Sequence, residues 1–263
     1  NLCDGDEVNG TPGVSVIDEL FRQQLIHTGS DTFFYDITTS KIPMKEAFDK
    51  AGVPTPGWEI LDKEGKNVKG LFERLGSPII VKPAVSGGSM GITINNVVHN
   101  EEECLQQLRK MHTGYHGWEL AAGGILAEQF IKGREFTTLI VGSGDELIFY
   151  PPVERVFHKD LPDTEQFLSF DRLWETYEEE KPVEGNQFLY NYFEPEPELL
   201  PRLRQISIDA YQSVGGTGYG RLDIRMDKDT GNMYVLEVNA QCGLSEDENF
   251  TSIGAILRIA GKS

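Results

Sequence analysis

A lysine followed by a glycine-rich segment is the first feature of this sequence that could carry chemistry. Lys82 ends an apolar run that begins at Pro78, and the segment SGGSMG, residues 86–91, leads into a second apolar run. This order predicts strand, loop and strand, whereas a Walker A loop and a dinucleotide-binding fingerprint both continue into a helix. Backbone amides of such a loop can bind phosphate oxygens while the lysine neutralises their charge. A flexible hairpin tip with a solvated lysine explains the same residues, so both interpretations stay open.

Alternating polar and apolar residues mark a second candidate site, in the last quarter of the chain. Arg221, Asp223 and Arg225 alternate with apolar residues, and after the turn DKDTGN so do Glu237 and Asn239. Successive side chains of a strand point to opposite faces, so this hairpin should have one apolar and one polar face. The apolar residues expected in the core are Leu222, Ile224, Met226, Leu236 and Val238.

The polar face of this hairpin suits a hard cation. A turn of this length can bring Asp223 near Glu237 across the two strands. Two adjacent carboxylates repel each other unless a positive charge lies between them, and Asn239 adds a third oxygen. Mg²⁺ prefers carboxylate oxygens combined with the phosphates of a substrate. The alternative is a solvated hairpin face with an Arg–Asp pair.

Two glutamates form a third and weaker candidate site. Glu128 closes one expected strand, and Glu135 opens the next after a turn that contains Lys132 and Gly133. A carboxylate at each strand end could accept hydrogen bonds from the amine and hydroxyl groups of a nucleoside. A surface hairpin explains these residues equally well.

Periodicity and turn residues predict the elements that would position these groups. Helices are expected at about residues 14–24, 40–52, 71–75, 100–112 and 201–213. Strands are expected at 58–61, 78–81, 91–95, 125–131, 136–141, 147–150, 219–226 and 233–240. The acidic and aromatic stretch 162–197 is predicted to be a long functional loop. Irregular alternation of strands and helices, with antiparallel hairpins, indicates an α+β or mixed α/β protein.

The overall composition narrows the function classes. The 263 residues contain 24 Lys and Arg against 42 Asp and Glu, and the formal net charge of −18 argues against a nucleic-acid-binding protein. No apolar stretch approaches the ~20 residues that span a bilayer. Cys3, Cys104 and Cys242 form neither a disulfide framework nor a zinc pattern, which suits a reducing, cytoplasmic compartment. The chain starts without Met and without a signal sequence, so we expect an N-terminal piece to precede it.

Taken together and in this order, the three groups resemble the ATP-grasp superfamily. The motifs are the Lys82 strand with its glycine-rich loop, then EQFIKGREFT, then GRLDIR with LEVNAQCG. The likeness runs from about Gly10 to the C-terminus and, within the superfamily, is greatest to D-alanine–D-alanine ligases. It implies an α/β fold with α+β elements, in which the nucleotide is held between two mixed or antiparallel sheet subdomains. The implied parts are the remainder of a truncated, Rossmann-like N-terminal subdomain (1–38), a central subdomain (39–141) and a C-terminal subdomain with the metal site (142–263).

The resemblance also implies the roles of individual residues. The ATP phosphates would be bound by Lys41 and Lys82, under a closing loop formed by Gly87, Gly88 and Ser89. The adenine would be held by Glu128 and the backbone of Gln129, Phe130 and Ile131, and the ribose by Glu135. Two Mg²⁺ ions, for which Mn²⁺ is an alternative, would be ligated by Asp223, Glu237 and Asn239. The catalytic groups would be Arg221, the backbone N–H of Gly243, and Ser89. The carboxylate of the second amino acid would meet Ser252 and Ile253.

By this resemblance the chain is an ATP-dependent carboxylate–amine ligase. ATP would phosphorylate a carboxylate, and an amine would then attack the acyl phosphate and expel phosphate. The expected partners are small amino acids or a related acid and amine. A homodimer is compatible with the resemblance, whereas neither a nucleic acid nor a membrane is an expected partner. The alternatives are a ligase for another acid–amine pair and a non-catalytic ATP-binding regulatory homologue.

Several positions depart from the family pattern, and all of them lie around the acceptor pocket. The acidic residue that binds the first ammonium belongs to an N-terminal stretch absent from this sequence. Leu173 and Trp174 replace a Lys–Tyr pair in the closing loop, and Gly88 replaces the serine that meets that tyrosine. Cys242 replaces a proline, and the loop before Ser252 is longer. These changes leave the ATP end of the site as the family pattern has it.

Overall fold

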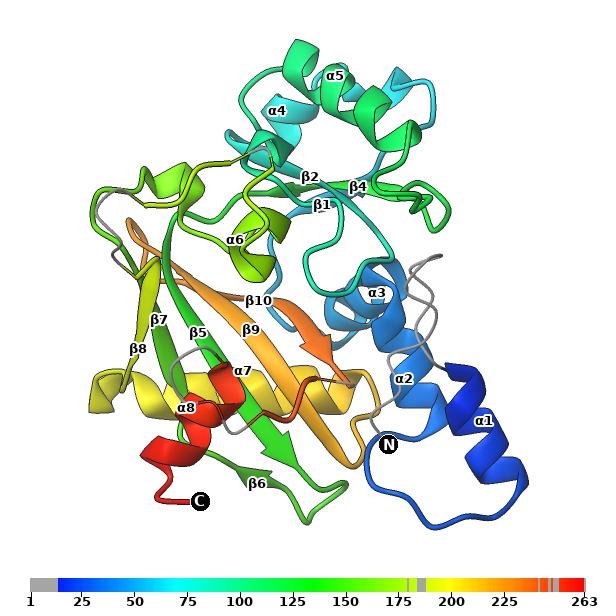
Figure 1. Cartoon of the computed structure of the whole chain (residues 1–263), viewed down its shortest axis with the longest axis vertical. Coiled ribbons are helices and arrows are strands. Elements are labelled where there is room, and N and C mark those ends of the chain that lie inside the picture. The colour runs from blue at the N-terminus through cyan, green and yellow to red at the C-terminus, as the bar shows by residue number, and fades with distance from the viewer. Residues whose placement is uncertain are drawn as a thin grey trace.

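The computed structural model describes residues 14–178, 180–183, 188–240, 242–245, 247 and 251–262 (Figure 1). Its helices are α1 (Val14–Arg22), α2 (Thr32–Thr39), α3 (Lys41–Ala51), α4 (Leu71–Leu75), α5 (Glu101–His112), α6 (Phe170–Trp174), α7 (Leu200–Ser213) and α8 (Ser252–Ile259). Its strands are β1 (Trp58–Ile60), β2 (Ile79–Pro83), β3 (Val97–Val98), β4 (Ile125–Gln129), β5 (Gly133–Val141), β6 (Ile148–Phe149), β7 (Val153–Phe157), β8 (Tyr190–Phe193), β9 (Tyr219–Asp227) and β10 (Met233–Asn239).

The strands form two antiparallel sheets. The smaller sheet has the order β1-β4-β2-β3. The larger sheet has the order β10-β9-β5-β7-β8, with β6 paired to β5. Figure 1 shows the small sheet with α4 and α5 at one end of the molecule and the large sheet at the other, with α6 between them. The predicted mixed α/β class with antiparallel sheets is therefore confirmed.

Helices α2, α3 and α7 cover one face of the large sheet, whereas α8 packs against part of the other face, beside Leu139 and Val153. Side chains of α2, α3 and α7 pack against β5, β9 and β10 in the main hydrophobic core, which includes Phe34, Phe48, Tyr211, Leu222 and Val238. A second core joins the small sheet to α4 and α5, through residues such as Leu71, Val81 and Leu108. The other face of the large sheet is the polar one, and it is turned toward the small sheet (Figure 1).

Helix α3 carries two lysines on its otherwise apolar buried face. Residues i, i+3, i+4 and i+7 lie on one side of a helix, and here they are Lys41, Met44, Lys45 and Phe48, all buried. Gly52 ends the helix in the left-handed conformation, with φ of 71°, and its N–H donates to the carbonyls of Phe48 and Asp49. The helix therefore holds Lys41 and Lys45 at fixed positions beside β10, the edge strand of the large sheet.

Because of a β-bulge in β10, the buried residues of the hairpin differ from those predicted. Val235 pairs with Ile224 but Glu237 pairs with Asp223, so Leu236 is an extra residue on this strand. Consequently Val235 lies in the core, whereas Leu236, which we expected there, is only partly buried. Strict alternation would have put Val235 and Glu237 on the same face. The bulge places Glu237 on the polar face with its partner Asp223.

The predicted strand at 91–95 is also wrong. This stretch ends in a 3₁₀ turn, Ile94–Asn96, and the strand that pairs with β2 is the short β3 that follows it. Thr93 caps the turn, and Asn96 donates to the carbonyls of Val81 and Gly91. The side chain of Asn96 thus ties this stretch to β2 by a hydrogen bond, although the stretch is not itself a strand. The stretch 162–197, predicted as a loop, contains α6 and β8.

None of the described helices is long and apolar enough to cross a membrane.

Candidate functional site

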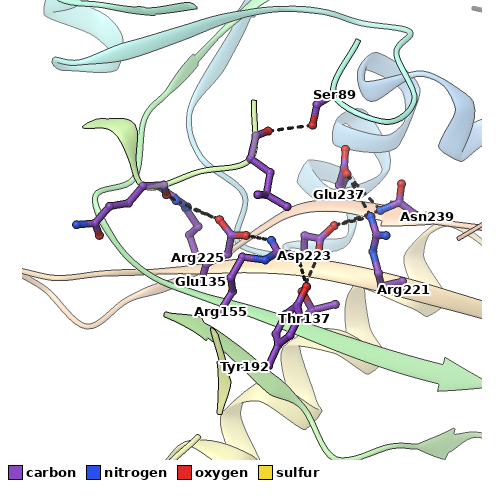
Figure 2. Close-up of polar contacts among 12 residues, drawn as sticks. Ser89, Glu135, Thr137, Arg155, Tyr192, Arg221, Asp223, Arg225, Glu237 and Asn239 are labelled. Atoms are coloured by element: carbon purple, nitrogen blue, oxygen red, sulfur yellow. Dashed lines mark hydrogen bonds and ion pairs between the residues drawn. The ribbon is translucent and has the colours of Figure 1, made fainter. Parts of the chain in front are cut away.

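The site centres on Asp223 and Glu237, which are cross-strand partners on the polar face of β9 and β10 (Figure 2). Asp223 accepts hydrogen bonds from Thr137 Oγ1 at 2.9 Å and from Arg221 at 3.0 Å. The amide of Asn239 donates to Glu237 at 3.2 Å and to Asp223 at 3.4 Å. The structure thus brings together the three residues predicted as metal ligands.

The electrostatics of this pair fit a divalent cation. Burial raises the pKa of Asp223, and the negative charge of Glu237 adds to that effect against the opposing charge of Arg221. Burial alone would also raise the pKa of Glu237, but Lys41 and Arg221 outweigh it and lower that pKa. Two carboxylates and an amide lie together on one partly buried surface, where Arg221 and Lys41 are their positive neighbours. This donor set suits Mg²⁺, which prefers carboxylate oxygens.

Two lysines predicted to bind phosphates lie beside this pair. Lys41 Nζ is 3.8 Å from Glu237 Oε2 and 3.0 Å from Ser86 Oγ, at the start of the glycine-rich loop. Burial lowers the pKa of Lys41, and Glu237 only partly offsets that effect. Lys82 Nζ donates to Glu128 Oε1 at 2.6 Å. Lys41 therefore links the loop to the carboxylate pair, and Lys82 lies close enough for its charge to act on both Lys41 and Glu237.

Glu128 is buried between two lysines, of which the sequence analysis named only one. Its other oxygen pairs with Lys45 Nζ, and the Lys45 side chain is completely buried. Burial would raise the pKa of Glu128, but Lys45 and Lys82 together lower it. The missed signal was the i, i+4 spacing of Lys41 and Lys45 on one helix face. This carboxylate is therefore ionised and held inside the protein.

Glu135, predicted to bind a ribose, lies in a network of arginines (Figure 2). Arg155 pairs with one carboxylate oxygen, and Arg225 donates to the other at 3.1 Å. Arg225 also donates to the carbonyl of Ile131 at 2.8 Å, and Arg155 to the Tyr192 hydroxyl at 3.0 Å. Sequence reasoning gave Arg225 no role beyond the alternation, and nothing in the sequence singled out Arg155. Each carboxylate oxygen of Glu135 already pairs with an arginine. Further hydrogen bonds can therefore be accepted only by the lone pairs that remain on these oxygens.

The glycine-rich loop is held by the long aromatic segment. Ser89 Oγ donates to the carbonyl of Leu168 at 2.9 Å, and Trp174 Nε1 donates to the carbonyl of Gly88 at 2.9 Å. A Cβ on Gly88 would lie 3.0 Å from the Trp174 ring, and its φ is 52°. Trp174 thus contacts Gly88. These are the two positions at which the sequence departs from the Tyr and the Ser of the family pattern. Gly87 has open space around it.

The remaining predicted residues border this space less directly. The amides of Gln129 and Phe130 donate to the carbonyls of Gly57 and Pro78, at 2.8 and 3.0 Å, and are already used by the fold. Ser252 and Ile253 are buried in the first turn of α8, which Thr251 caps. Gly243 has open space where a Cβ would lie. Residue 241, before Gly243, and residues 246 and 248–250, between Gly243 and α8, are outside the described part of the chain.

Arg221 lies beside the carboxylate pair, two residues before Asp223 on β9. Its guanidinium is 3.0 Å from Asp223 and 4.0 Å from Glu237. Burial would lower its pKa, but Asp223 outweighs that effect and raises it. Among the described residues its Nε, which is buried, has no hydrogen-bond partner. The arginine is therefore permanently charged and retains a donor for a further acceptor.

Comparison with known families gives one match that spans most of the chain. The family model described as D-ala D-ala ligase C-terminus matches residues 47–255. The D-alanine–D-alanine ligase of Xanthomonas axonopodis pv. citri is 28% identical over 83% of this chain and 60% of the relative. That of Desulfotalea psychrophila is 30% identical over 84% of this chain and 62% of the relative. The chain thus spans about 60% of the length of these curated relatives.

Solved structures of such ligases have the same architecture. The crystal structure of the D-alanine–D-alanine ligase from Bacillus anthracis, complexed with ATP, matches with a TM-score of 0.68 and 20% identity, covering 94% of this chain and 69% of that one. The D-Ala:D-Ser ligase from Enterococcus faecalis matches with a TM-score of 0.69 and 18% identity, covering 95% and 64%. At these identities the likeness concerns the fold alone.

Proposed function

Because the chain belongs to the D-alanine–D-alanine ligase family, matched by its C-terminal model over residues 47–255, we propose that it is the ATP-binding part of an ATP-dependent ligase. This ligase joins the carboxylate of one D-alanine to the amine of a second. The chain has the ATP-grasp fold of the solved ligases. The observation that carries the proposal is the approach of Lys41 to Glu237, a pair in which the lysine would bind a phosphate and the carboxylate a metal ion.

The nucleotide would lie between the two sheets. Lys41 and Lys82 would neutralise its phosphates, and the backbone of the loop 86–91 would donate hydrogen bonds to them. Glu128 and Glu135 would accept hydrogen bonds from the adenine amine and the ribose hydroxyls. The buried surroundings strengthen each of these interactions, because the local dielectric is low.

The carboxylate pair would hold Mg²⁺. Asp223, Glu237 and Asn239 would ligate it. We propose further that two ions bind there and that Mn²⁺ can take the place of Mg²⁺. Bound there, the metal would neutralise charge on the β- and γ-phosphates and favour phosphoryl transfer.

Arg221 and Gly243 would act on the reacting carboxylate. Phosphorylation turns this carboxylate into an acyl phosphate, and attack by the amine creates a tetrahedral centre with a negatively charged oxygen. Arg221 would stabilise that charge through its charged guanidinium, and the N–H of Gly243 would donate to the same oxygen. Ser252 and Ile253 would contact the carboxylate of the second amino acid.

The assembly of the whole protein extends this proposal. We infer boundaries between its parts near residues 38 and 141. A substrate such as ATP favours a cytoplasmic protein. A homodimer is a separate prediction, and light scattering on the purified protein would test it.

The direct test is release of phosphate from ATP in the presence of amino acids. We expect release only when D-alanine is present, with D-alanyl-D-alanine as the second product identified by mass spectrometry. L-alanine is the matched control, and D-serine with D-alanine tests another acceptor, because the departures from the family lie around that pocket. Binding of ATP and Mg²⁺ by calorimetry without phosphate release from any pair would instead identify a non-catalytic homologue.

The contact between Trp174 and Gly88 leads to a separate prediction. Trp174→Phe retains an aromatic ring but removes the N–H that donates to Gly88. A neutral hydrogen bond contributes about 1 kcal/mol, so we expect the closed loop to be about fivefold less populated and to admit water to the acyl phosphate. The ratio of ADP to dipeptide formed should therefore rise several-fold. Leu173→Ala, in the same turn of α6, is the control, and an unchanged ratio in Trp174→Phe would contradict this role.

A further inference from the structure

One buried charge in the site has no role in the chemistry proposed above. Lys45 is completely buried on α3, where an apolar residue would pack without the cost of desolvating an ammonium group. Burial lowers its pKa to about 8, against the opposing effect of Glu128, so the side chain is charged at pH 7. The groups that pair with this buried charge should therefore show what it does in the protein.

The partners of Lys45 join the two sheets. Its Nζ pairs with Glu128 on β4 of the small sheet and donates to Thr55 Oγ1 at 2.7 Å. Thr55 Oγ1 in turn donates to the carbonyl of Val235 at 2.9 Å, on β10 of the large sheet. The amide of Val235 also donates to the carbonyl of Pro54 at 2.8 Å. Segment 54–55 thus makes two hydrogen bonds to one residue of β10.

Val235 is the residue at which β10 changes register. The bulge lies between Val235 and Glu237, and it is the bulge that turns Glu237 toward Asp223. A bulge aims the side chains that follow it, and its geometry depends on how its unpaired backbone groups are satisfied. Thr55 and Pro54 satisfy the backbone groups of Val235. They therefore act on the orientation of a carboxylate that would bind the metal.

We propose that Lys45 and Thr55 are positioning residues of the ligase. Lys45 holds the side chain of Glu128 in one conformation, and Thr55 does the same for the bulge before Glu237. The inference rests on the proposed function, because it concerns how the ATP and metal groups of that reaction are held. Neither residue touches substrate in this scheme. Lys45 acts through Glu128, and Thr55 acts through Val235.

Charge balance explains why a lysine is required at position 45. Glu128 carries one negative charge and pairs with both Lys45 and Lys82, so these three groups have a net charge of +1. Without Lys45 their net charge would be zero, and Lys82 would be the single counterion of a buried carboxylate. Less of its positive charge would then be available to a phosphate. Loss of Lys45 should therefore weaken ATP binding.

The first test is binding of a non-hydrolysable ATP analogue with Mg²⁺, measured by calorimetry on Lys45→Met. Methionine has a similar length and removes only the charge and the donor. We expect affinity and the KM for ATP to weaken about tenfold, the effect of one lost charge-assisted interaction, with kcat and the KM for D-alanine changed less than threefold. Lys50→Met, exposed on the same helix, is the matched control.

Thr55→Val and Thr55→Ser form the second test, which decides the matter if Lys45→Met does not fold. Valine removes the hydroxyl that links Lys45 to Val235, whereas serine keeps it. We expect Thr55→Val to need several-fold more Mg²⁺ for half-saturation by the analogue and Thr55→Ser to resemble the wild type. Equal affinities in wild type, Lys45→Met and Thr55→Val, with only the midpoint of thermal unfolding lowered, would overturn the inference. If the wild type does not bind the analogue, it is the proposed function that fails.

Discussion

Replacing Asp223 with asparagine should lower the rate of D-alanine-dependent phosphate release by about 10³-fold, because metal-ion catalysis contributes several kcal/mol and each 1.4 kcal/mol is a factor of ten. The substitution keeps the shape of the side chain and an oxygen that can accept from Thr137. It removes the negative charge that would ligate Mg²⁺. Asp229→Asn, in the exposed turn at the end of the same hairpin, is the control.

The same variant should be no less stable than the wild type. The pKa of Asp223 is raised by burial beside Glu237, which means that its ionised form is disfavoured in the folded protein. A carboxyl group whose pKa is higher in the folded than in the unfolded protein destabilises the fold at pH values above its folded pKa. Removing this charge therefore relieves a cost of folding. In thermal unfolding without metal the midpoint should stay level or rise.

The contrast between the two measurements identifies the carboxylate as a functional group. Addition of Mg²⁺ and an ATP analogue should raise the unfolding midpoint of the wild type, because a ligand that binds only the folded state stabilises it. The midpoint of Asp223→Asn should rise much less. Full activity in this variant, or an equal response to Mg²⁺, would show that the metal lies elsewhere.

Replacing Arg221 with methionine should lower kcat by about 10²–10³-fold, the range found when a donor to a developing oxyanion is removed. Its guanidinium lies 3.0 Å from Asp223 on one side and has an unpaired, buried Nε. The charge it would stabilise forms only during phosphoryl transfer and amine attack. We therefore expect kcat to fall far more than the KM for ATP changes.

Arg221→Lys separates charge from geometry. Lysine keeps the positive charge but loses the planar set of N–H donors, so it can reach only one acceptor at a time. We expect it to recover part of the lost rate, about tenfold, if charge and donor geometry each contribute. A large rise in the KM for ATP with kcat unchanged, in steady-state kinetics of either variant, would place Arg221 in ground-state binding instead.

Local patterns predicted a large part of the fold. The alternation in β9 predicted that Leu222 and Ile224 are buried on one face, and both are in the main core. The helix predicted at about residues 40–52 agrees with α3, which begins at Lys41 and ends at Ala51. The period-2 pattern and helix-ending chemistry involve neighbours in the chain, so they can be recognised without knowing the tertiary structure.

The same local reasoning failed where a strand departs from its period. Nothing in MYVLEVN indicates which residue is the extra one, because Val235, Leu236 and Val238 are all apolar. The structure selects Leu236, through the hydrogen bonds of Val235 to Pro54 and Thr55 from a distant segment. The strand predicted at 91–95 failed for a related reason, since a side-chain hydrogen bond of Asn96, rather than a strand ladder, ties this stretch to β2.

The sequence by itself determined the types of group in the site, because lysines, carboxylates and a glycine-rich loop in this order need no structure to be read. It also determined which face Asp223 takes, through the two-residue period of β9. Only the tertiary structure decided the counterions: Lys45 for Glu128, and Arg155 for Glu135. A buried charge is neutralised by whatever lies nearest in space, and that depends on how the two sheets and α3 pack rather than on distance along the chain.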